Sequence, residues 1–81
     1  MTNLRVWVWD YDLGVVYADA KTLREAYNIY RTFKKRGHSV LTVGIEMYNA
    51  KDDEWEDWVA LLDGVEYRAE NLGEYLKKIG E

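Results

Sequence analysis

The sequence lacks cysteine and proline, and it contains one histidine and one serine. Without cysteine, disulfides, zinc thiolate sites and thiol nucleophiles are excluded, which suits a reducing cytoplasm. His38 and Ser39 are adjacent, and neighbours on a strand point to opposite faces, so they do not form a Ser-His catalytic couple. We expect His38 at the solvent edge where a strand begins.

Long apolar segments are also missing. The N-terminal stretch MTNLRVWVWD alternates valine with tryptophan, unlike a signal peptide or a membrane helix. The chain has 81 residues, of which 48% are hydrophobic, so residues 1–81 are expected to form a single compact domain. We expect a cytoplasmic protein without membrane attachment, in the host cytoplasm if it is virus-encoded.

Charge is unevenly distributed along the chain. The net charge is −4, yet residues 21–38 contain six basic residues and one acidic residue, whereas residues 46–74 contain ten acidic residues and two basic residues. An acidic chain repels nucleic-acid phosphates, so direct nucleic-acid binding is disfavoured. The segregated charge instead favours docking onto a basic protein surface.

Apolar periodicity predicts an α+β domain. Alternating and β-branched segments predict strands over residues 4–10, 15–20, 39–49 and 65–69. The helix that follows Thr22 has a capping box with Glu25 and a stop at Gly37, and a second capping box, Asn71 with Glu74, predicts a C-terminal helix.

The segment KDDEWEDWVALLDG, residues 51–64, can be interpreted in two ways. As a helix, it is capped by Asp53 and Glu56. As a strand, it enters a tight turn at Asp63-Gly64. We favour the strand, because GVVYADAKTLREAY and GVEYRAENLGEYL resemble each other as hairpin-plus-helix units. The predicted fold is an antiparallel five-stranded sheet with two helices on one face, in the order ββα-βββα. The alternative is ββαβαβα with residues 54–62 helical.

The stretch VWVWDYDLG resembles the opening of haloacid dehalogenase-type phosphatases. The resemblance implies Asp10 as the nucleophile and Asp12 as the acid/base beside Mg²⁺, with Lys51 and Asp52 or Asp53 as the later motifs. The chain departs from the family in having leucine directly after the second aspartate, and it is too short for the family's parallel sheet. A minimal phosphatase-like enzyme is therefore the third functional hypothesis.

Other sites lack the residues that they need. A zinc site lacks ligands, and DYDLG has neither the third acid nor the terminal glutamate of an EF-hand loop. No glycine-rich phosphate loop is present. We therefore expect no catalytic residues, no metal site and no cofactor.

Tryptophan defines the most informative surface. Trp7 and Trp9 lie on one face of their strand, and two helices can cover only the opposite face of the sheet. Trp58 and Val16 are expected to join them. Each tryptophan can bury about 200 Å², so such a face exceeds what monomers usually expose unless arginine stems, from Arg5 and Arg68, cover it.

The leading hypothesis is a non-catalytic protein-interaction module. It would be a small acidic inhibitor or accessory protein, of the phage or mobile-element type, that binds a basic, nucleic-acid-handling host protein. A homodimer through the tryptophan face is also possible. The predicted protein-binding residues are Asp52, Asp53, Glu54, Trp55, Glu56, Asp57, Trp58, Trp7 and Trp9.

The alternative hypothesis is a small-molecule or nucleotide sponge. It would be a homo-oligomer with a pocket between protomers, lined by Trp7, Trp9, Tyr17 and either Arg5 or Lys35.

Overall fold

Two helices and six strands form the part of the chain that the computed structural model describes, residues 3–36 and 39–80. The elements, in order, are β1 (Leu4–Asp10), β2 (Gly14–Ala20), α1 (Leu23–Lys34), β3 (Val40–Asn49), β4 (Glu54–Asp57), β5 (Ala60–Leu62), β6 (Val65–Tyr67), the 3-10 turn η1 (Ala69–Asn71) and α2 (Leu72–Lys78). The predictions for Gly37 and His38 lie outside the described residues.

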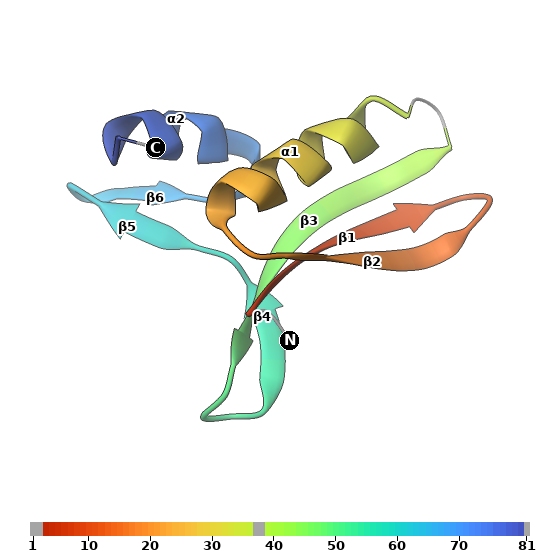
Figure 1. Ribbon diagram of the computed structural model, residues 1–81, viewed down its shortest axis with the longest axis horizontal. Helices are drawn as coiled ribbons and strands as arrows, with labels where there is room; N and C mark the ends of the chain where they lie inside the picture. The colour runs from red at the N-terminus through yellow and green to blue at the C-terminus, as the bar shows by residue number, and fades with distance from the viewer. Residues whose placement is uncertain (1–2, 37–38, 81) are drawn as a thin grey trace.

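The main sheet has four antiparallel strands in the order β2-β1-β3-β4, and β5 and β6 form a separate two-stranded sheet. In the register, Trp7 of β1 lies between Tyr17 of β2 and Gly44 of β3. Figure 1 shows α1 on one face of the main sheet and α2 beside the β5–β6 hairpin, while the end of β3 and β4 project away from both helices.

The α+β class and the antiparallel pairing are confirmed, but the single five-stranded sheet is wrong. The segment after Asp57 leaves the main sheet, because the Trp58 ring turns into the core and packs 5.4 Å from the Tyr75 ring. The Trp58 amide still donates to the Ile45 carbonyl at 2.9 Å, after which the chain forms β5. Residues 54–62 are extended on both sides of this break, so the helical alternative is wrong.

One hydrophobic core joins the two sheets and both helices. Its sheet side includes Val6 and Ile45, and its α1 side includes Ala26 and Tyr30. The other members buried in it are Ala20, Trp58, Tyr67, Ala69, Leu72 and Leu76. In the described part of the chain, neither helix is long and apolar enough to cross a membrane.

Turn and cap residues explain where most elements begin and end. Thr22 Oγ1 accepts from the Glu25 amide at 3.1 Å, so the first cap is confirmed. Asp63 and Gly64 have φ angles of 51° and 79°, as the predicted tight turn requires.

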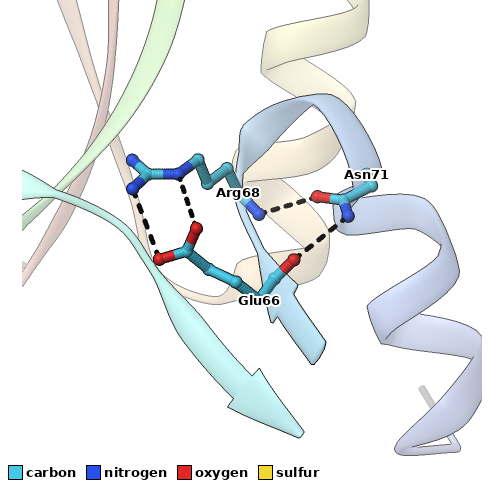
Figure 2. A network of polar contacts seen from close by, with 3 residues as sticks. All are labelled: Glu66, Arg68 and Asn71. Carbon is cyan, nitrogen blue, oxygen red and sulfur yellow. Dashed lines mark hydrogen bonds and ion pairs between the residues drawn. The ribbon is translucent and has the colours of Figure 1, made fainter. Parts of the chain in front are cut away.

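The second capping box is wrong. The Asn71 side chain accepts from the Arg68 amide at 2.7 Å and donates to the Glu66 carbonyl at 3.4 Å, so it closes the turn between β6 and η1 (Figure 2). Arg68 also pairs with the Glu66 carboxylate at 3.4 Å. Asn71 is thus committed to η1, and its side chain makes no capping bond to α2.

Candidate functional site

The face of the main sheet that is turned away from α1 carries a continuous set of rings. Val6 and Ile45 point toward α1, so their neighbours on β1 and β3 point the other way. We call this surface the aromatic face, and it comprises Trp7, Trp9, Val15, Tyr17, Tyr48 and Trp55. Trp9 is 52% exposed, Val15 55% and Tyr17 53%, so its outer part is open to solvent.

Trp7 lies flat against the backbone of Gly44, the residue opposite it on β3. A Cβ atom on residue 44 would lie 2.6 Å from Trp7 Cε2 and 2.8 Å from Cζ2, so only glycine leaves room for the ring. The indole Nε1 atom is buried and has no hydrogen-bond partner among the described residues. The ring is therefore fixed by packing on Gly44.

Arg5 connects the aromatic rings of separate strands. Its guanidinium lies 4.0 Å from the Tyr17 ring centroid and 4.1 Å from that of Trp55, and its Nε donates to Glu46 at 2.8 Å. Stacking of this kind on two rings is favourable and holds the planar group in place. The alternative that arginine side chains cover this face is therefore met in part, since Arg5 lies over Tyr17 and Trp55, while Arg68 pairs with Glu66 and lines a hollow together with Trp7.

Two residues expected on the aromatic face, Trp58 and Val16, lie elsewhere, as does Lys35, which was expected in the sponge pocket. Trp58 is only 6% exposed and lies in the core, since it hydrogen-bonds to Ile45 and shares that residue's inward face. Val16 lies opposite Val8, on the α1 side, and Val15 takes its expected place. Lys35 caps the C-terminal end of α1, across the sheet from the rings.

Residues 49–57, which we call the acidic hairpin, comprise the end of β3, the turn after it and β4, and they project from the body of the molecule (Figure 1). Three carboxylates, Asp52, Glu54 and Glu56, have oxygen atoms within 4.8 Å of one another, and all three residues are exposed. Asp53 and Asp57 are exposed as well. Three of the five predicted acidic residues are therefore clustered on the hairpin. Their spacing would also suit a divalent cation, but exposed acidic groups are common without one.

Local hydrogen bonds hold the acidic hairpin in a defined shape. Asn49 Oδ1 accepts from the amides of Lys51 and Asp52 at 3.0 and 3.3 Å, and its Nδ2 donates to Asp52 and Glu56 at 3.1 and 3.2 Å. The Tyr48 hydroxyl donates to the Asp53 carboxylate. This hydrogen bond, together with burial and the nearby charge, raises the pKa of Tyr48.

Trp55 joins the acidic hairpin to the aromatic face. Side chains alternate along β4, so the Trp55 ring lies on the aromatic face, whereas Glu54 and Glu56 point to the opposite face. The Trp55 ring is 5.4 Å from that of Tyr48 and 4.1 Å from the Arg5 guanidinium. The connection to the acidic residues runs through Tyr48, whose ring contacts Trp55 and whose hydroxyl donates to Asp53.

A small hollow lies at the margin of this surface. Trp7, Gly44, Asp57, Arg68 and Glu70 contribute to its lining, and its volume is about 160 Å³. Pockets for small molecules usually enclose roughly 300–1,000 Å³. This hollow is smaller than that range, whereas a second hollow beside α1, lined in part by Tyr30, Lys34 and Glu70, has a volume of about 330 Å³.

Asp10, the nucleophile that the phosphatase resemblance implied, is 1% exposed and holds the β1–β2 turn. Its carboxylate accepts from the amides of Asp12 and Leu13 at 2.8 and 3.2 Å and from Ser39 Oγ at 3.3 Å, and it pairs with Arg36 at 3.4 Å. Burial opposes its ionisation, but these hydrogen bonds and the guanidinium outweigh burial and lower the pKa of Asp10.

The other residues of the phosphatase resemblance lie at the far end of the sheet. Asp10 pairs with Val40 at the start of β3, whereas Lys51, Asp52 and Asp53 follow the end of that ten-residue strand. Ten extended residues span about 30 Å. The structure therefore does not bring these residues together.

No protein-family model, curated protein or solved structure matches the chain. What the chain does must therefore follow from its own surface and geometry.

Proposed function

We propose that this chain is a non-catalytic protein-interaction module that binds a basic surface of a partner protein through the acidic hairpin and the aromatic face. Such a module would act in the cytoplasm as a small inhibitor or accessory factor, of the phage or mobile-element type, of a protein that handles nucleic acid. The observation that carries the proposal is the chain of contacts through Tyr48 and Trp55, which links the hairpin carboxylate of Asp53 to the rings of the aromatic face.

The acidic hairpin supports the electrostatic part of this proposal. Carboxylates held close together on a projecting turn create a strong local negative potential, which speeds encounter with a basic surface. The Asn49 and Tyr48 hydrogen bonds keep the turn ordered before binding, so less conformational entropy is lost on association.

The aromatic face supports the anchoring part. Tryptophan and tyrosine are enriched among the residues that dominate binding energy, and they act best when surrounded by a polar rim that excludes water. Trp9 and Tyr17 are open for burial by a partner, while Arg5 and Gly44 keep the neighbouring rings in place. Acidic residues of the hairpin would form that rim.

The proposal is tested by affinity capture from a lysate of the host with two matched variants. Asp52→Asn, Glu54→Gln and Glu56→Gln together remove three charges from the hairpin. Asp63→Asn, Glu70→Gln and Glu74→Gln remove three charges from the β5–β6 and α2 side. We expect the unmodified chain and the second variant to retain the same basic protein. The hairpin variant should release that protein at a lower salt concentration.

Two results would contradict the proposal. One is equal retention by both variants, which would show that charge at the hairpin is irrelevant. The other is a retained partner that is acidic, because clustered carboxylates would repel it. Trp9→Ser tests the anchoring part separately, since it should accelerate dissociation without changing the salt dependence of association.

A further inference from the structure

The outer edge of β2 is unpaired in the part of the chain that the structure describes, because β2 is the first strand in the order β2-β1-β3-β4. The direction of its polar groups follows from β1. The Tyr48 amide donates to the Asn3 carbonyl at 2.8 Å, so Asn3 directs its polar groups toward β3, as do Arg5, Trp7 and Trp9 by alternation. The remaining β1 residues, which include Val6 and Val8, therefore direct theirs toward β2.

The same alternation assigns the two sides of β2. Val16 and Ala18 lie opposite Val8 and Val6, so their polar groups point back toward β1. Val15, Tyr17 and Asp19 consequently present three N–H and three C=O groups at the outer edge. These six groups form a template for another strand.

The β2 edge lacks the features that usually protect such a template. Residues 14–20 contain no proline and no lysine, and their seven pairs with β1 run without a bulge. Asp19 is the single charged residue among them. An edge this regular, with Val15 and Tyr17 open to solvent, is suited to pairing.

We propose that a second copy of this chain pairs with β2 in antiparallel fashion about a two-fold axis at Tyr17. Tyr17 would lie opposite the second copy's Tyr17, and Val15 opposite the second copy's Asp19. Directly opposite residues on paired strands share a face of the sheet. An axis between two residues would place residues of opposite faces against each other, so the axis must pass through a residue position. Tyr17 is the middle residue of β2, and this register alone pairs all six outward groups of each copy.

Charge at the strand ends fits the same register. Lys21, just after β2, would approach the second copy's β1–β2 turn, which carries Asp12. Both residues are exposed, and neither forms an ion pair with a described residue. The two-fold axis creates this pairing twice, and it leaves both aromatic faces on one side as a single wider surface. The inference thus goes beyond the proposed function, which one chain alone could perform.

The absence of cysteine allows a direct cross-linking test. With Tyr17→Cys, the two thiols would sit at directly opposed positions with Cα atoms about 5.5 Å apart, within reach of a disulfide. Val15→Cys is the matched control, on the same face of the same strand and equally exposed, but its two copies would be about 13 Å apart. Under mild oxidation, Tyr17→Cys is expected to form the covalent dimer about tenfold faster or more, because the wider separation cannot be bridged without backbone movement.

Sedimentation of the unmodified chain gives a second measurement, with a mass of two chains expected. Asp19→Pro removes an outward N–H, and a single-chain mass with an unchanged circular dichroism spectrum is expected. Two results would overturn the inference. One is a single-chain mass for the unmodified chain at every concentration, and the other is equal cross-linking of the two cysteine variants. A dimer that persists in Asp19→Pro and dissociates in Trp9→Ser would overturn it as well, because it would place self-association on the aromatic face. Neither measurement involves a partner protein, so the proposed function stands or fails separately.

Discussion

Gly44→Ala perturbs the aromatic face directly, because it disturbs the packing of Trp7 on the β3 backbone. The added Cβ would meet the Trp7 ring at distances below 3.0 Å, so the ring must move or the strand must shift. Inserting a methyl group into a close-packed site costs about 1–3 kcal/mol. Alanine also restricts the unfolded chain more than glycine does, which offsets about 0.4–1 kcal/mol. The net destabilisation should be about 1–2 kcal/mol.

Urea unfolding monitored by tryptophan fluorescence measures both consequences of Gly44→Ala. The unfolding midpoint should fall, and the native emission should shift because the indole nitrogen of Trp7 loses its buried position. In thermal unfolding, each 1 kcal/mol corresponds to roughly 4–8 °C for a domain of this size. Thr42→Ala, on the same face of β3, is the control and should change little. A more stable Gly44→Ala variant with unchanged native emission would refute the packing of Trp7 on Gly44.

Two further predictions concern stability. Asp10→Asn should make the unfolding free energy depend less on pH in the acid range. The pKa of Asp10 in the folded state lies below its ordinary value of 3.8, so its ionised carboxylate stabilises the fold above that value. This stabilisation is lost as the pH falls through the folded pKa. The difference in unfolding free energy between the variant and the unmodified chain should therefore be larger at pH 7 than at pH 3, and a constant difference would contradict this. Trp58→Ala should cost about 3–5 kcal/mol in urea unfolding, because it empties a core position, whereas Trp9→Ala should cost far less. Equal losses would contradict the assignment of Trp58 to the core and Trp9 to the surface.

Much of the fold could be predicted because its local signals agree with the final packing. The α1 helix, its Thr22 cap and the Asp63-Gly64 turn depend on neighbours in sequence, and each is present as expected. The break at Trp58 could not be predicted in this way. No glycine or proline marks it, and the apolar run of residues 58–62 continues without interruption after it. Burial of the Trp58 ring against Tyr75, a contact between distant segments, decides where the sheet ends.

The exposure of the acidic residues could be predicted from the sequence, whereas the arrangement of the aromatic rings could not. The acidic residues were expected at the surface, and they are exposed there, since a dense run of carboxylates has no low-cost buried arrangement. The stacking of Arg5 between Tyr17 and Trp55 depends on the register of four strands, which the sequence pattern does not specify. Gly44 was the one available signal, because a glycine inside a strand often marks a close approach of another group.

The association rate constant of the captured partner, measured as a function of salt concentration, tests the central claim most directly. For the unmodified chain, the rate should fall steeply as salt rises, because screening weakens steering by the acidic hairpin. The triple variant Asp52→Asn, Glu54→Gln and Glu56→Gln should associate more slowly at low salt and depend less on salt, while the Asp63→Asn, Glu70→Gln and Glu74→Gln control should keep most of the slope. Equal slopes for the hairpin variant and the unmodified chain would contradict the claim that this hairpin recognises a basic partner.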